Sequence, residues 1–258
     1  MFKRSLTALI LLACQLPAAL CAVESPAVSH TLSFPQRTNQ YVHINTKIPV
    51  AANQVEWALP SWTPGSYLIR DFVADLERFR ASTADGRPLP VRKLAKNRWR
   101  IDTRGVTELI LDYDVWAGER NVAVSWVESG IALLNGAGLF LYSDESRNWP
   151  QRVSIRLPED WPRVHTSLQE AEGENSFTAR DYDELIDSPI VAGDTVEFGF
   201  EVERQGYALV LSGRNRFWDG EKSASDVARL VETHQNFWGV NPFDRDYLFL
   251  NFFFRLGI

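Results

Sequence analysis

The chain between residues 30 and 203 has the pattern of many short strands. Apolar and polar residues alternate clearly in residues 194–203 and in the second half of residues 106–116. A period of two residues places every second side chain on one face of a strand. Shorter segments of strand length are residues 30–34, 41–48, 55–59, 89–94, 98–102, 121–127, 138–142 and 153–157.

Turn residues such as Asp85-Gly86 and Asn135-Gly136 separate these segments, and no regular helical pattern lies between them. Many short strands at this spacing are typical of antiparallel sheets that pack face to face. The pattern therefore predicts a mainly β protein in which residues 23–215 form an antiparallel β-sandwich domain.

A helical period begins only near residue 220. Ser223 and Asp226 match a capping box, and apolar residues then recur at the spacing of one helix face. Gly239 stands where a left-handed residue would end the helix. These signals predict a helix over about residues 223–238.

A strongly apolar run follows this helix and predicts a strand over about residues 246–254. Such a strand usually needs neighbours on both edges and cover on both faces. We therefore expect residues 216–258 to be the start of an incomplete α/β-type domain. The alternative is that this strand docks on the sheet that precedes it.

Residues 1–22 have the order of regions found in a secretory signal: basic residues, an apolar run, then small residues up to Ala22. We expect export to the periplasm or the extracellular space, with cleavage near Ala22; a lipid-modified Cys14 is the alternative. Cleavage would remove Cys14 and Cys21, the two cysteines of the chain, and with them any disulfide or thiol chemistry. No later apolar run approaches the ~20 residues of a membrane span.

Composition narrows the possible partners. The net charge is −6 and the isoelectric point is near 5.3, which argues against a general surface for nucleic acids or anionic membranes. Apolar residues make up 45% of the chain and aromatic residues 12%, so a disordered chain is excluded.

Two longer segments are Leu59-Pro-Ser-Trp-Thr-Pro-Gly-Ser-Tyr-Leu-Ile-Arg-Asp-Phe72 and Asp181-Tyr-Asp-Glu-Leu-Ile-Asp-Ser-Pro189. They resemble the N-terminal region of glycyl aminopeptidase-type zinc metallopeptidases, and residues 216–258 resemble the opening of the catalytic domain of that family. The resemblance continues in order through nearly all of the chain after residue 22. Supporting segments are residues 85–89, 96–99, 113–117, 135–142, 241–243 and 247–249.

The resemblance implies a β-sandwich that precedes a thermolysin-like catalytic domain, often followed by a PDZ module. In that family, zinc is held by a helix with the motif His-Glu-x-x-His and by a carboxylate further on. Two histidines at i and i+4 share one helix face and can bind one zinc ion, while the glutamate activates its water. This sequence has no such motif, and its four histidines are isolated at positions 30, 43, 165 and 234.

We therefore expect no catalytic residue, no metal ligand and no cofactor in this chain, with zinc only in complete family members. The chain is expected to be truncated before the zinc-binding motif and to be inactive as a peptidase alone. Its expected partner is the missing catalytic domain, and a peptide is a further candidate.

Trp62, Tyr67, Arg70 and Asp71 of the first segment are candidates for a substrate-cleft wall or an interdomain loop. The alternative is an aromatic-clamped type II turn centred on Pro64-Gly65 that only joins two strands.

Asp183, Glu184 and Asp187 of the second segment are candidates of the same kind. A calcium loop of the EF-hand type is excluded, because Ile186 stands where that loop needs glycine. A carboxylate pocket for an amine remains open beside a purely structural acidic loop.

Two other functions stay open. One is a stand-alone exported β-sandwich module that binds a peptide or glycan through Trp62, Tyr67 and nearby aromatic residues. The other is an enzyme that uses paired carboxylates, such as a glycosidase, for which sequence gives no carboxylate separation.

Overall fold

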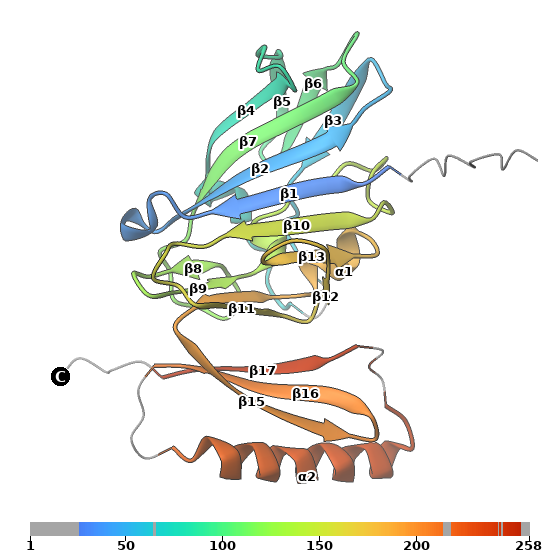
Figure 1. Ribbon diagram of the computed structural model, residues 1–258. Helices are drawn as coiled ribbons and strands as arrows, with labels where there is room; N and C mark the ends of the chain where they lie inside the picture. Colours follow the sequence, from blue (N-terminus) through green and yellow to red (C-terminus); the bar gives the residue numbers. More distant parts are fainter. Residues whose placement is uncertain (1–25, 64–65, 214–217, 242, 244, 254–258) are drawn as a thin grey trace, which may run out of the picture.

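The computed structural model describes residues 26–63, 66–213, 218–241, 243 and 245–253. The predicted signal segment and the predicted Pro64-Gly65 turn lie outside these residues. The described chain folds into a β-rich body, residues 28–193, and a separate layer below it, which we call the C-terminal layer (Figure 1). The prediction of a mainly β protein with antiparallel sheets is confirmed.

The largest sheet of the body has seven strands. Adjacent strands are antiparallel except β1 and β10, which pair in parallel with Val28 opposite Gln151. The order across the sheet is β12 (Gln169–Glu170), β13 (Ser176–Ala179), β10 (Gln151–Arg156), β1 (Val28–Ser33), β2 (Tyr41–Pro49), β7 (Glu108–Trp116) and β4 (Leu76–Thr83).

Two smaller antiparallel sheets complete the body. One is β3 (Gln54–Ala58), β6 (Arg98–Asp102) and β5 (Val91–Ala95); the other is β11 (Arg163–Thr166), β14 (Ile190–Gly193), β9 (Ile131–Leu134) and β8 (Trp126–Val127). The short helices are η1 (Arg37–Asn39), η2 (Phe72–Asp75), η3 (Gly136–Gly138) and α1 (Tyr182–Ile186).

One hydrophobic core joins the three sheets of the body. Trp57, Tyr113 and Phe140 come from different parts of the chain and are each at most 1% exposed. The hydroxyl of Tyr113 donates to the carbonyl of Leu139 at 2.8 Å, which satisfies its polar end inside the core. The body is therefore a single packed unit.

The C-terminal layer consists of β15 (Thr195–Val202), β16 (Gln205–Ser212), α2 (Gly220–Trp238) and β17 (Tyr247–Phe252). β15 and β16 form a hairpin whose two turn residues, Glu203 and Arg204, have positive φ angles of 49° and 68°, as a type I′ turn requires. β17 pairs in parallel with β16, and α2 is the crossover between them.

The sheet of this layer lies between the body and α2. Leu250 and Phe252 of β17 pack toward the body, whereas Phe249 packs in a small core with Leu209 and Ala224 on the α2 side. The apolar run after the helix is thus a strand that docks on the preceding sheet, which was the alternative interpretation. The division predicted between residues 215 and 216 falls inside this layer.

The predicted helix is confirmed, but it begins one turn earlier than expected. Asp219 is the N-cap, and its side chain accepts from the backbone N–H of Lys222 at 3.0 Å. Ser223 lies inside the helix, where its hydroxyl donates to the carbonyl of Asp219, so the predicted capping box is wrong. Gly239 ends the helix with φ of 67°, as predicted.

Only Trp126 and Val127 of the predicted strand over residues 121–127 are in a strand, β8, and residues 138–142 form no strand. The side chain of Asn121 accepts from the N–H of Ala123, and that local turn delays the strand until Trp126. Asn135 similarly caps η3 through Ala137, and residues 138–142 contribute only an isolated bridge from Tyr142. Side-chain-to-backbone bonds by asparagine therefore replace strand pairing at both places.

Candidate functional site

A cleft of about 870 Å³ opens beside α1, and we call it the α1 cleft. Trp62 lines one side after the end of β3, and the segment from Arg180 to Asp187 lines another. Arg147 and Arg245 complete the charged part of its lining. Of the seven predicted site residues, the fold brings together Trp62, Asp183, Glu184 and Asp187 in this cleft.

Local chemistry fixes α1 against the body. The side chain of Asp181 accepts from the N–H of Glu184 at 2.8 Å, which caps the first turn. Tyr182 and Leu185 are buried, and the Tyr182 hydroxyl donates to the carbonyl of Phe140 at 2.7 Å. Burial raises the pKa of Tyr182 well above its ordinary value, so the phenol stays neutral. The acidic side chains of α1 are left facing outward.

Asp183 is paired with an arginine at the mouth of the α1 cleft. Arg147 donates to its two carboxylate oxygens over distances of 2.9 to 3.1 Å. Both side chains are more than half exposed, so this pair contributes only about 0–1 kcal/mol to stability. The carboxylate of Asp183 is nevertheless occupied, which weakens the interpretation of an open amine pocket.

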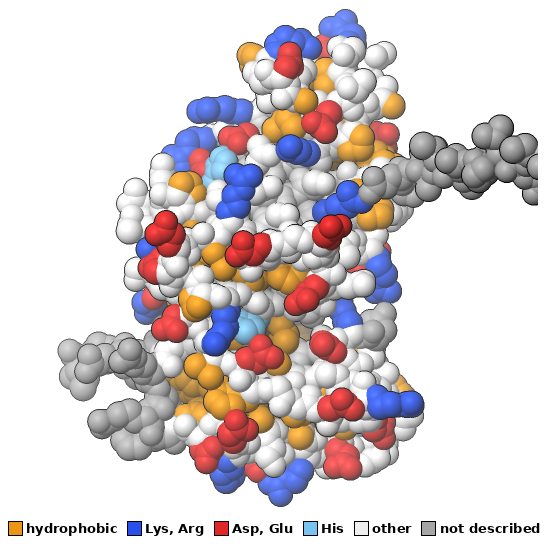
Figure 2. Space-filling view, viewed as in Figure 1, with side chains coloured by type: hydrophobic (Ala, Val, Ile, Leu, Met, Phe, Trp, Pro, Cys, Tyr) orange, Lys and Arg blue, Asp and Glu red, His pale blue; other side chains and the backbone are white. Residues whose placement is uncertain are grey.

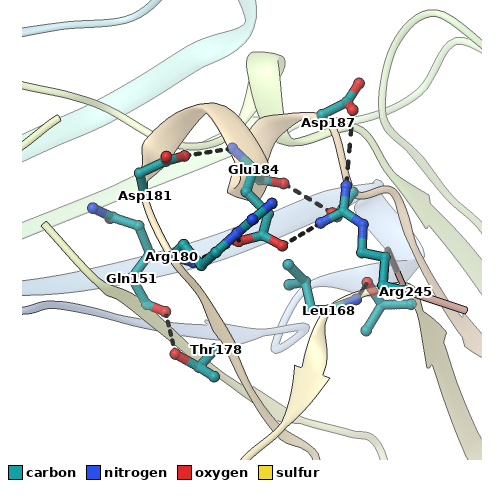
Figure 3. Close-up of polar contacts among 10 residues, drawn as sticks. Gln151, Leu168, Thr178, Arg180, Asp181, Glu184, Asp187 and Arg245 are labelled. Carbon is teal, nitrogen blue, oxygen red and sulfur yellow. Dashed lines mark hydrogen bonds and ion pairs between the residues drawn. The ribbon is translucent and has the colours of Figure 1, made fainter. Parts of the chain in front are cut away.

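Glu184 is a largely enclosed carboxylate of the cleft, with its side chain 13% exposed. Arg180 donates to one of its oxygens from both the backbone N–H, at 2.6 Å, and the guanidinium, at 3.0 Å. Arg245 reaches the other oxygen from the segment between α2 and β17 (Figure 3). Glu184 therefore ties the C-terminal layer to the body.

Asp187 is the most exposed acidic side chain of the same group, at 86%. Its nearest cation is Arg245, whose guanidinium nitrogen lies 3.9 Å from the carboxylate. The position of Arg245 between Glu184 and Asp187 gives the cleft alternating charges rather than a single acidic surface. Over the face drawn in Figure 2, basic and acidic side chains are also interspersed.

The first sequence segment is divided between two places. Trp62 is 47% exposed, and its indole N–H donates to the carbonyl of Ser66 at 2.8 Å, which folds the loop back on itself. Arg70 and Asp71 line a separate pocket of about 270 Å³, where Asp71 pairs with Lys96. Tyr67 is fully exposed and lines neither of these two pockets.

The four histidines have different surroundings in the fold. His30 is buried in the body, and His43 on β2 contacts Asp112 and Asp114. His165 lies where the body meets the C-terminal layer, and His234 is on α2. In the part of the chain that the structure describes, no three histidine, cysteine or acidic side chains are grouped so that they could hold a metal ion. No helix of that same part is long and apolar enough to cross a membrane.

The sequence profile of the peptidase M61 N-terminal domain matches residues 29–194. The chain belongs to this family. Both segments that suggested the resemblance lie inside the matched region, so the predicted relationship is confirmed. The match ends at the junction of β14 and β15, which is where the M61 N-terminal body gives way to the C-terminal layer.

Solved structures agree with this assignment. The chain is similar to an aminopeptidase N family protein from Idiomarina loihiensis, with a TM-score of 0.82 and 28% identity over 87% of this chain and 39% of that one. It shares the fold of an M1 zinc metallopeptidase from Deinococcus radiodurans, with a TM-score of 0.51 and 14% identity over 88% of this chain and 56% of that one. No curated protein matches the chain. The M61 chain thus spans only part of the length of these structures.

Sequence reasoning missed the basic half of the α1 cleft. Arg147, Arg180 and Arg245 are widely spaced and belong to no motif. The i,i+4 spacing of Arg180 and Glu184 was the one local signal that could have indicated an ion pair. The contacts of Arg147 and Arg245 depend on tertiary structure, since their partners are 36 and 61 residues away.

Proposed function

We propose that this chain is the N-terminal, non-catalytic part of an exported metallopeptidase of the aminopeptidase class, and that it has no peptidase activity by itself. The observation that carries the proposal is the lack of any His-Glu-x-x-His motif among its 258 residues. Without a metal-activated water, hydrolysis of a peptide bond loses its nucleophile. Zinc would be held by residues that this sequence does not contain.

The family and the similar structures support this assignment at the level of the domain. The chain belongs to the M61 N-terminal domain family and covers 39% of the aminopeptidase N family protein. The remaining catalytic part is the proposed partner, with the α1 cleft and Trp62 on the surface that meets it or its peptide substrate. The contact from Arg245 to Glu184 supports an interdomain role for the acidic loop.

Export is proposed from the leader pattern of residues 1–22 alone. Expression of the full chain in a bacterial host should place a shortened product in the periplasmic fraction. N-terminal sequencing of that product should give a start near residue 23. A full-length product that stays in the cytoplasm would contradict export.

A metal and activity assay tests the proposed lack of peptidase activity. Purified residues 23–258 should contain no stoichiometric zinc after incubation with zinc and desalting, and should not hydrolyse glycyl- or alanyl-p-nitroanilide. A zinc aminopeptidase assayed in parallel serves as the positive control. One zinc per chain together with turnover would refute the proposal.

A stand-alone binding module is the second candidate, and the exposure of Trp62 at the α1 cleft favours it. This function predicts saturable binding of a peptide or glycan that Trp62→Ala abolishes while the fold is kept. Trp116→Ala is the matched control, because Trp116 on β7 is 41% exposed and does not line the cleft. If both variants bind alike, the aromatic loop is not a binding site.

A further inference from the structure

His165 lies at the contact between the body and the C-terminal layer. Its Nε2 is 2.8 Å from the hydroxyl oxygen of Thr195, and its Nδ1 is 3.1 Å from a carboxylate oxygen of Glu197. His165 belongs to β11 of the body, whereas both partners belong to β15 of the layer. His165 and Thr195 are 7% and 2% exposed, so their contact is buried, whereas the Glu197 side chain is 48% exposed.

The layer has its own small core and meets the body through a second apolar cluster, in which Leu250 and Phe252 pack against body residues such as Val191. Leu209, Leu211 and Ala224 form a cluster that is separate from the main core. Trp126 and Phe252 meet edge to face across the junction, with ring centroids 5.1 Å apart. A separate core allows the layer to move as a unit without unfolding the body.

Open space surrounds the remaining attachments. Clefts of about 500 Å³ and 760 Å³ lie between body residues such as Leu168 and layer residues such as Asp246. Arg163 donates to the carbonyl of Thr195 at 2.5 Å, and Arg245 pairs with Glu184. In the described residues, the contact of His165 is therefore one of the polar links between the two parts, beside those of Arg163 and Arg245.

The neutral ring fits this contact. Glu197 can only accept, so Nδ1 carries the ring hydrogen, and Nε2 accepts from the hydroxyl of Thr195. A second proton at Nε2 would reverse that bond, so that Nε2–H donates to the Thr195 oxygen and the buried hydroxyl hydrogen needs another acceptor. Burial lowers the pKa of His165, although the nearby Glu197 carboxylate acts in the opposite direction and Arg163 adds to the lowering.

We propose that His165 is an acid-sensitive latch, whose protonation loosens the C-terminal layer from the body while the body stays folded. This inference is independent of the proposed function. Opening the layer returns the ring to water and to its ordinary pKa of 6.5, so the latch is fully closed above that value and weakens as the pH falls below it.

Other charged and titratable groups line the same cleft. Burial raises the pKa of Tyr207, so that group stays neutral. The groups that face His165 or share the cleft walls with it are Arg163 on β11, Glu170 on β12, Glu197 and Glu201 on β15, Tyr207 on β16, and Asp246 before β17.

Hydrogen–deuterium exchange followed by mass spectrometry tests the latch on residues 23–258. After correction for intrinsic exchange, the equilibrium constant for opening of β15–β17 should rise as the pH is lowered from 7.5 to 5.5. The comparison is with the same constant for the seven-stranded sheet. One proton limits the rise to about tenfold over this interval. A layer that stays equally protected, or a body that loses protection together with it, would overturn the proposal.

Two variants identify the titrating group. His165→Gln cannot be protonated and should abolish the pH response, whereas His43→Gln, on the outer face of β2, should keep it. Glu197→Gln removes the charge that favours the protonated ring, so the acid-induced rise should be larger than in the wild type. Because Glu197 is half exposed, that variant tests the latch even if His165→Gln does not fold. An unchanged response in His165→Gln or a smaller one in Glu197→Gln contradicts the proposal.

Discussion

His30 shows how much a single buried side chain can determine at the residue scale. Gln151 donates its amide N–H to the carbonyl of Trp149 at 2.7 Å, which fixes the amide so that its oxygen accepts from His30. Thr46 occupies the other ring nitrogen at 3.0 Å. The ring is held neutral in the core, and burial lowers its pKa to about 4.

This environment predicts a loss of stability in acid. The folded pKa lies below the unfolded value of 6.5, so His30 destabilises the fold progressively as the pH falls from 6.5 to about 4. The loss over that window is on the order of 3 kcal/mol. Urea unfolding of the His165→Gln protein at pH 7 and pH 4.5 measures it without the contribution of the latch. Adding His30→Gln to that protein should make its free energy of unfolding depend less on pH. An equally steep dependence would contradict the role assigned to His30.

Gly193 gives a second prediction at this scale. It has φ of 134°, and a Cβ there would lie 2.3 Å from the carbonyl oxygen of Gly130. Gly193→Ala should therefore lower the free energy of unfolding by about 3 kcal/mol, from backbone strain and steric overlap together. Gly105→Ala is the matched control, since Gly105 also has a positive φ but has open space around it. Gly105→Ala should lower the free energy of unfolding by only about 1 kcal/mol. Equal losses in the two variants would mean that the protein relieves the overlap at Gly193.

Individual site residues were predictable only where the fold brings the residues of a sequence segment to one cleft. Trp62, Asp183 and Glu184 were identified from sequence and do line one cleft. Arg70 and Asp71, only eight and nine positions after Trp62, lie directly before η2 and line another pocket beside Lys96. Proximity in a motif does not fix the direction in which a loop presents its side chains.

At the scale of elements, the start of α2 tests how helix ends are chosen. Two candidate caps, Asp219 and Ser223, lie one turn apart, and the structure uses the first. Asp219→Ala should lower the free energy of unfolding by about 1 kcal/mol, because the N–H of Lys222 loses its acceptor. Ser223→Ala should change it by less than about half of that, since Ser223 only donates back to a carbonyl within the helix. Thermal unfolding of both variants distinguishes the two caps. A larger loss of stability in Ser223→Ala than in Asp219→Ala would support the predicted cap at Ser223.

Strands were predictable from sequence where one face meets the core and the other meets water. β2 and β7 alternate buried and less buried positions along their length, as their sequences indicated. β16 was missed, because Tyr207 to Leu211 are all buried between two layers and leave no alternation to detect. The same burial explains why β9 and β14 were missed. β14 also pairs with β9, a partner far along the chain.

At the scale of the whole molecule, α2 leaves part of its sheet uncovered. An apolar groove of about 650 Å³ runs between α2 and β17, lined by residues such as Leu230, Trp238 and Phe249. Leu230 and Trp238 are 65% and 68% exposed. Exposed apolar surface of this kind limits the solubility of a protein.

The groove leads to a prediction about behaviour in solution. The double variant Leu230→Glu, Trp238→Lys should raise the soluble concentration several-fold and reduce the fluorescence of bound anilinonaphthalene sulfonate. Val196→Lys is the control, because Val196 is 51% exposed on β15 and does not line the groove. If the control improves solubility equally, charge rather than the groove is responsible.

The parallel pairing of β1 with β10 limits the order in which the polypeptide can fold during synthesis. Val28 finds its partner only when Gln151 is available, 151 − 28 = 123 positions later. At ordinary rates of synthesis this interval takes roughly 6 to 25 seconds. Throughout that time the first strand emerging from the ribosome has one edge without its final neighbour, which leaves the nascent chain open to chaperones and to transport in an unfolded form.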